Sequence, residues 1–134
     1  KPWLKELPGD YNKRYMTYTH TNFPEEQGAK LVRDKIPEII EANEKVKART
    51  RILNEAEFID ALVNKLTEEG AELKHAVADR DNSHIMEEIG DNLEVLQAIA
   101  KACSVDFDEV IKMQNHKKDI RGGFDKRILL LGKE

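Results

Sequence analysis

Apolar side chains recur with helical spacing through most of the chain that follows residue 54. Between Glu55 and Ala78 they return at intervals of four or seven residues, which places them on one face of a long helix. Asn54 stands just before this stretch and Glu57 follows three residues later, the arrangement of a capping box. The apolar face of this first helix consists of Phe58, Leu62, Leu66, Leu73 and Val77.

A second helix is predicted over residues 84–103, with Ser83 as its cap and Glu87 at the capping-box position. Because the connection over residues 79–82 is short, the two helices should pack antiparallel. The second helix is apolar on several sides, which is typical of a helix in the middle of a bundle and predicts a partner chain. Its main stripe would be Ile85, Ile89, Leu93, Leu96 and Ala100, with a second flank of Val95, Ala98, Ile99 and Ala102.

Shorter elements complete the expected fold. We expect Asp34 to cap a short helix whose first turn contains Pro37. A loop over 44–51 would follow it, and residues 51–53 could form a short strand. After Asp106 a third helix is predicted over 107–120, with Gly122 and Gly123 as its stop. The tail over 124–131 could be a strand or packed coil.

The sequence therefore predicts an all-α protein: an antiparallel helical bundle of the four-helix type over residues 30–134. Residues 1–29 would form an extended N-terminal arm, since this segment holds three of the four prolines and all three tyrosines. The alternative is that part of it is a mobile tail, with Met16 as a candidate native start. A short C-terminal tail would end the domain.

Composition and charge narrow the classes of function. Charged residues make up 36% of the chain and the formal net charge is −4. Without an extended basic block, we do not expect the protein to bind a nucleic acid polymer. The chain contains no apolar run near the length of about 20 residues that a membrane span needs. Cys103 is the only cysteine and cannot pair within the chain, so we expect a cytoplasmic protein.

Four acidic residues occupy unusual positions on the two long helices. Glu69 falls on the apolar face of the first helix, with Glu72 one turn further along. Glu88 and Asp91 lie in line with the buried flank of the second helix. In an antiparallel hairpin all four side chains come level, and such a cluster needs a hard divalent cation such as Mg²⁺, Mn²⁺ or Ca²⁺. The ordinary explanation for a single pair of this kind is solvated surface charge.

Gly70 lies inside the same stretch, where glycine costs a helix about 1 kcal/mol. Its presence suggests that a backbone or a ligand approaches closely at this position. The segment from Glu68 to Glu72, followed by Glu88 and Asp91, reads E-E-x-x-E and E-x-x-D. This pattern resembles the signature of the MazG-like all-α nucleoside triphosphate pyrophosphohydrolases. Two flanking segments, residues 30–37 and 121–124, are similar to a branch of that superfamily related to phosphoribosyl-ATP pyrophosphohydrolases.

The resemblance implies Mg²⁺-dependent cleavage between the α and β phosphates of a nucleotide, with Mn²⁺ as a further candidate ion. Carried over position by position, it makes Glu69, Glu72, Glu88 and Asp91 the metal ligands. Glu68 matches the first glutamate of the motif and would orient or deprotonate the attacking water. Glu68 and Glu69 are thus the candidate catalytic residues.

Cationic and amide side chains are needed to hold the remaining phosphate oxygens and the nucleoside. The candidates are Lys30, Arg33, Lys35, Asn92, Asn115, Lys118 and Arg121. Lys118 and Arg121 could instead complement the dipole at the end of the third helix. The two asparagines could be satisfied polar residues of the core. Gly122 and Gly123 could let the backbone approach a phosphate, although a plain helix cap explains them equally well.

Two rival functions remain open from the sequence. One is a non-catalytic bundle whose carboxylates bind Ca²⁺ structurally or lie in solvent. The other is a di-iron oxidase, because Glu72 and His75 form one E-x-x-H element of the kind that such proteins use twice. His75, His84 and His116 are expected at the surface. We expect a homodimer, with a tetramer as an alternative, and the preferred base and sugar are left open.

Overall fold

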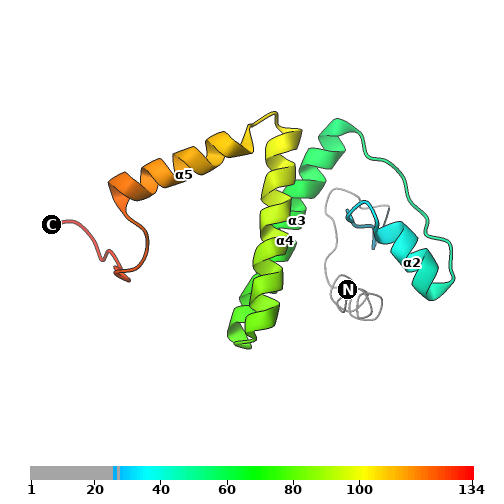
Figure 1. The fold of residues 1–134 in the computed structure, drawn as a ribbon, viewed down its shortest axis with the longest axis horizontal. Helices are drawn as coiled ribbons and strands as arrows, with labels where there is room; N and C mark the ends of the chain where they lie inside the picture. Colours follow the sequence, from blue (N-terminus) through cyan, green and yellow to red (C-terminus); the bar gives the residue numbers. More distant parts are fainter. Residues whose placement is uncertain (1–25, 27) are drawn as a thin grey trace.

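The computed structural model describes residues 26 and 28–134, which form four helices and no strand (Figure 1). The helices are α2 (Ile36–Glu44), α3 (Glu55–Ala78), α4 (Asn82–Ala102) and α5 (Phe107–Arg121). The all-α fold class is therefore confirmed, and the strand considered for residues 51–53 is not formed. The expected N-terminal arm falls almost entirely on residues outside the described part of the chain.

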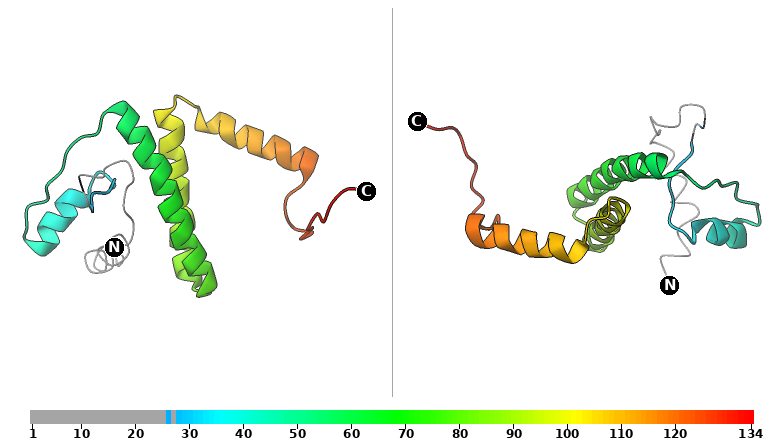
Figure 2. Two further views of the ribbon diagram at one scale, coloured as in Figure 1. Left: turned by 180° about the vertical axis from the view of Figure 1, so that it is seen from behind. Right: turned by 90° about the horizontal axis from the view of Figure 1, so that it is seen from above.

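The centre of the molecule is the antiparallel hairpin of α3 and α4, which lie side by side along most of their length (Figures 1 and 2). Helix α3 has the predicted bounds, and its capping box is formed. The side-chain oxygen of Asn54 accepts a hydrogen bond from the Glu57 amide at 2.9 Å. The Asn54 amide donates in return to Oε1 of Glu57 at 3.2 Å, so two amides at the helix start are satisfied.

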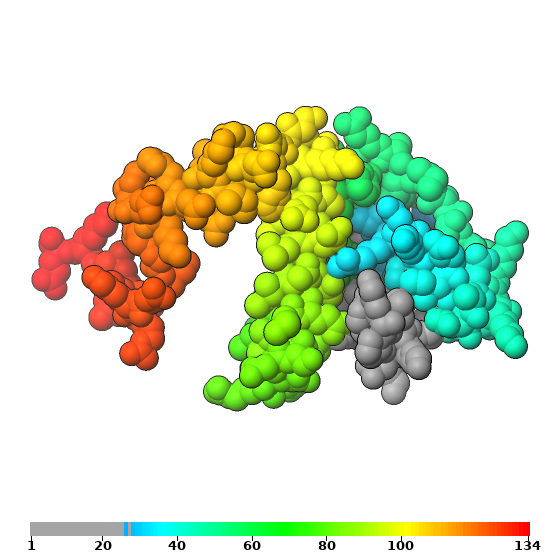
Figure 3. Space-filling model, viewed as in Figure 1, coloured from blue at the N-terminus to red at the C-terminus, as the bar shows by residue number. Residues whose placement is uncertain are grey.

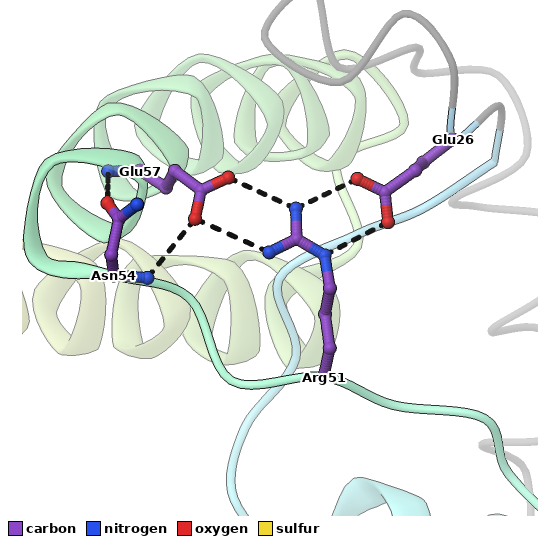
Figure 4. A network of polar contacts seen from close by, with 4 residues as sticks. All are labelled: Glu26, Arg51, Asn54 and Glu57. Atoms are coloured by element: carbon purple, nitrogen blue, oxygen red, sulfur yellow. Dashed lines mark hydrogen bonds and ion pairs between the residues drawn. The ribbon is translucent and has the colours of Figure 1, made fainter.

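Arg51 ties this helix start to the chain near its N-terminus (Figure 4). Its Nη2 donates to Oε1 of Glu26 at 2.8 Å and to Oε2 of Glu57 at 3.1 Å. These hydrogen bonds lower the pKa of both carboxyl groups. The network anchors one end of the segment over residues 28–35, which we call the strap.

Two of the predicted caps are wrong. The cap of α4 is Asp81 rather than Ser83: the Asp81 carboxylate accepts from the His84 amide at 3.2 Å. The preceding residue, Arg80, adopts a left-handed φ of 53°, which tightens the turn so that the helix begins two residues earlier than expected. Helix α2 has Lys35 at its cap position with no side-chain hydrogen bond, so Asp34 does not cap it.

The face of α4 that packs on α3 also differs from the prediction. Val95 of the predicted second flank and Ala100 of the predicted main stripe are buried, whereas Ile89, Leu93 and Leu96 of the main stripe are each more than 40% exposed. Asn92 explains this rotation, because its side-chain amide donates to the Glu69 carbonyl at 3.0 Å and holds that side of α4 against α3. The hairpin thus leaves an apolar face of α4 uncovered.

Helix α5 extends away from the hairpin and touches only the end of α4 (Figures 2 and 3). None of its residues is buried. The tail beyond it is neither strand nor packed coil in the described structure, since Phe124 and residues 128–131 are largely exposed. No described helix combines the length and the apolar character that crossing a bilayer demands.

Candidate functional site

The middle of the α3–α4 hairpin is filled by carboxylates rather than by apolar side chains. Glu68 is 4% exposed, Glu69 is 3% exposed and Glu88, the largest fully buried side chain described, is 1% exposed. Together with the partly buried Glu72 and Asp91, these residues form what we call the acidic cluster. Burying several like charges is strongly unfavourable unless cations compensate them.

The carboxylates converge in two groups that share Glu88. Ligand oxygens of Glu69, Glu88 and Asp91 lie within 4.8 Å of one another, and the same holds for oxygens of Glu72 and Glu88 with a ring nitrogen of His84. The structure therefore brings together all four residues that the sequence indicated as metal ligands. Helical spacing of three residues on each helix, combined with the antiparallel arrangement, produces this convergence.

His84 also lies at the candidate site, where the sequence pattern did not place it. It was expected at the surface, but it is half-buried, and its Nε2 lies 3.2 Å from Oε1 of Glu88. The signal was present, because His84 precedes Glu88 by four residues and such pairs meet on one helix face. His75, by contrast, is exposed and belongs to neither group of ligand atoms, which does not favour the di-iron arrangement.

Two lysines compensate the buried charge on the α3 side. The Nζ of Lys65 lies 3.2 Å from Oε2 of Glu68 and 3.8 Å from Oε1 of Glu69. Lys30, on the strap, has a buried Nζ atom. Burial lowers the pKa of its ammonium group to about 8, against the attraction of Glu68, which favours the charged form. The predicted substrate residue Lys30 thus lies beside the acidic cluster.

Arg33 supplies a third positive charge, on the α4 side of the acidic cluster. Its Nη2 atom lies 2.8 Å from Oδ1 of Asp91, a residue 58 positions further along the chain. The strap therefore reaches both helices of the hairpin, and it places two of its three candidate phosphate-binding residues at the acidic cluster. The third, Lys35, is exposed.

Asn92 has a structural role in this arrangement. Its Nδ2 atom donates to the carbonyl oxygens of Glu69 at 3.0 Å and of Glu88 at 2.7 Å. The bond to Glu69 crosses the hairpin from α4 to α3, whereas the bond to Glu88 lies within α4. Together they hold the backbones that carry two of the most buried carboxylates of the acidic cluster. The reading of Asn92 as a satisfied polar core residue accounts for this geometry.

The remaining candidates lie on α5 and are not brought to the acidic cluster within one chain. Asn115, Lys118 and Arg121 are exposed on a helix that leads away from the hairpin (Figure 1). Gly122 adopts a φ of 82°, and its amide donates to the Lys118 carbonyl at 2.8 Å, the geometry of a helix cap. A Cβ atom at Gly70 would meet nothing within 4 Å, so no described residue approaches it closely.

The donor set of the acidic cluster fits a divalent cation. Carboxylate oxygens are the preferred ligands of Mg²⁺, Mn²⁺ and Ca²⁺, and the second group adds one imidazole nitrogen, a ligand that later transition metals also accept. The fit rests on the burial of Glu69 and Glu88, because carboxylates at this depth gain most from a multivalent counter-ion. The cluster can therefore bind a divalent metal ion.

Comparison with known proteins agrees with this chemistry. No curated protein and no solved structure matches the chain. The family model of the MazG nucleotide pyrophosphohydrolase domain matches residues 58–122, a range that covers almost all of α3, all of α4 and α5, and the whole acidic cluster. Residues 58–122 are therefore similar to a MazG nucleotide pyrophosphohydrolase domain, which is consistent with membership of the MazG-like superfamily.

Proposed function

We propose that the protein is a metal-dependent nucleotide pyrophosphohydrolase that cleaves a (d)NTP, or a related nucleotide, between the α and β phosphates. The products would be a nucleoside monophosphate and pyrophosphate, and the activity would serve to clear unwanted nucleotides from the cytoplasm. The observation that carries this proposal is the convergence of buried carboxylates from α3 and α4 in the domain that matches the MazG family.

Glu69, Glu72, Glu88 and Asp91 would hold the metal, with Mg²⁺ as the favoured ion and Mn²⁺ as the alternative. A bound divalent ion supplies Lewis acidity and neutralises the negative charge of the polyphosphate. The site is already compact in the structure, because the Asn92 hydrogen bonds fix the backbone on both sides of it. Little rearrangement of the hairpin is needed to complete it.

Glu68 is our candidate for the residue that orients the attacking water and accepts its proton. In the reaction the water oxygen forms a bond to phosphorus, the bond from phosphorus to the α–β bridging oxygen breaks, and pyrophosphate departs. The Nζ atom of Lys65 lies 3.2 Å from Oε2 of Glu68 and places a positive charge beside this carboxylate. The neighbouring Lys30 provides a second positive charge at the same place.

Cations from two parts of the chain would bind the phosphates. Lys30 and Arg33 belong to the strap and lie at the acidic cluster of their own chain, and Lys35 is an exposed residue of the same strap. Lys118 and Arg121 are carried away from it by α5, and we propose that they act, with Asn115, at the site of a second copy. Such an exchange would place the basic end of α5 against the acidic cluster of its partner.

The uncovered apolar surfaces favour a homodimer for the same reason. Ile89, Leu93 and Leu96 form an exposed apolar face on α4, and α5 has no buried residue at all. An isolated helix of 15 residues is only marginally stable in water, so α5 needs a surface to pack on. A second copy of the hairpin supplies that surface and would complete a four-helix bundle, with a tetramer as the larger alternative.

The test is incubation of the protein with a panel of NTPs and dNTPs, with Mg²⁺ or Mn²⁺, followed by separation of the products. We expect a monophosphate and pyrophosphate from at least one member, and no turnover by Glu69→Gln. The exposed Glu94 on α4 provides the control, since Glu94→Gln removes the same charge outside the acidic cluster. Folded protein that binds metal but releases no pyrophosphate from any member would favour the non-catalytic bundle.

A further inference from the structure

The ion pair between Arg33 and Asp91 places a fixed positive charge on a carboxylate that we assign to the metal. The Nη2–Oδ1 distance is 2.8 Å, so the guanidinium contacts the carboxylate directly. Arginine keeps its charge at every ordinary pH and therefore cannot yield by losing a proton. A divalent cation on Asp91 would bring two further positive charges next to this guanidinium.

The metal-free and the metal-bound arrangements differ in what the Arg33 side chain can contact. The Arg33 side chain is 58% exposed while that of Asp91 is 24% exposed, so the guanidinium approaches the acidic cluster from its solvent side. A pair this open contributes little stability and can be exchanged at low cost. Once displaced, the planar guanidinium is suited to bidentate binding of phosphate oxygens.

The rest of the strap has contacts that do not depend on this pair. Lys30, three residues earlier, inserts a buried Nζ atom beside Glu68 on α3. Glu26, two residues before the strap begins, is held by Arg51 through bonds of 2.8 and 3.0 Å (Figure 4). Arg33 can therefore leave Asp91 while the strap keeps it beside the site.

We propose that Arg33 is an exchangeable counter-ion, which neutralises Asp91 in the metal-free protein, is displaced when a divalent cation binds, and then contacts the polyphosphate. The last step rests on the proposed function, whereas the first two concern metal binding alone. The exchange would couple the two ligands, since the metal both attracts the polyphosphate and releases a cation to hold it.

The first experiment measures Mn²⁺ binding without nucleotide by isothermal titration calorimetry, for the wild type, Arg33→Gln and Lys35→Gln. Arg33 competes with Mn²⁺ for Asp91 through an exposed ion pair, and such a pair contributes little free energy. Arg33→Gln should therefore bind Mn²⁺ about two- to five-fold more tightly than the wild type. Lys35→Gln loses the same charge from an exposed side chain two residues away, so it should change the affinity less. Weaker or unchanged binding in Arg33→Gln would overturn the exchange and make Arg33 a residue that positions Asp91 for the metal.

A second measurement needs no variant that could fail to fold. The side-chain Nε–H signal of Arg33 is followed by NMR in the wild type while Mg²⁺ is added, and then inorganic pyrophosphate. We expect one shift when Mg²⁺ displaces Arg33 and another when pyrophosphate captures it. A signal unaffected by saturating Mg²⁺ would overturn the proposal.

These outcomes are independent of the outcome of the nucleotide panel. Protein that cleaves nucleotides but shows no Arg33 exchange would keep the proposed function and lose this inference. Protein that shows the Mg²⁺-dependent displacement but cleaves nothing would keep the counter-ion exchange and lose the function.

Discussion

Neutralising Glu88 should stabilise the metal-free protein. This carboxylate is 1% exposed and belongs to both groups of ligand atoms, within 4.8 Å of oxygens of Glu69, Glu72 and Asp91. Two like charges at that distance repel by about 3.5 kcal/mol at an effective dielectric constant near 20. The nearby His84, at 3.2 Å, and the compensating cations offset much of this repulsion. We therefore expect a net gain of about 1–2 kcal/mol for Glu88→Gln, since the amide keeps the shape and loses the charge.

Thermal unfolding followed by circular dichroism measures this effect directly. In EDTA, Glu88→Gln should melt about 3–8 °C above the wild type. Adding Mn²⁺ should raise the melting temperature of the wild type and leave the variant nearly unchanged, because a ligand that binds the folded state stabilises it. Glu94→Gln, on the same helix but exposed, is the matched control and should behave as the wild type. Repulsion at Glu88 is ruled out as a source of instability if Glu88→Gln melts below the wild type in EDTA. A role for Glu88 in metal binding is ruled out if Mn²⁺ stabilises the wild type and Glu88→Gln equally.

Three further predictions concern the fold and the assembly. Asn92→Ala should lower the free energy of unfolding by about 1–2 kcal/mol in urea, because the bond to Glu69 across the hairpin and the bond to Glu88 within α4 are lost. An unchanged value would contradict their importance. Arg51→Gln should destabilise the protein at neutral pH but not in acid, because Arg51 lowers the pKa of Glu26 and Glu57. The stabilisation by Arg51 is therefore present above about pH 4.5 and is lost as the pH falls through the lowered pKa values. Thermal melts from pH 2 to 7 check this, and a difference that persists at the lowest pH would argue against it. Leu93→Lys should shift the protein from dimer to monomer in sedimentation equilibrium, and a dimer that survives would place the interface elsewhere.

The sequence was most informative where local signals agreed with one another. Helix α3 has the predicted bounds because the Asn54 capping box coincides with the start of the apolar period. The start of α4 was misplaced, since Asp81 and Ser83 are both good caps, and the tight turn at Arg80 decided between them. The convergence of the acidic residues could be predicted from the sequence, because it requires only helical spacing on each long helix and a short connection between the two helices.

Tertiary and quaternary effects limited the remaining predictions. When a helix has two apolar faces, its sequence does not reveal which face packs against its own chain. For α4, the hydrogen bond from Asn92 to the Glu69 carbonyl fixes the packed face, and the apolar period does not predict this bond. The contact between Arg33 and Asp91 joins segments that are far apart in sequence, so the resemblance indicated a role for the strap but not its partner. Among the described helices α5 contacts only the end of α4, and its sequence pattern does not encode its direction.

We infer that carboxylates from two neighbouring helices form one site for a divalent cation. Loss of the free Mn²⁺ signal in electron paramagnetic resonance, measured against protein concentration, tests it most directly. We expect saturable binding by the wild type and by Glu94→Gln, and binding at least about ten-fold weaker in Glu88→Gln, which removes the ligand shared by both groups. Equal Mn²⁺ binding by all three proteins would contradict the claim.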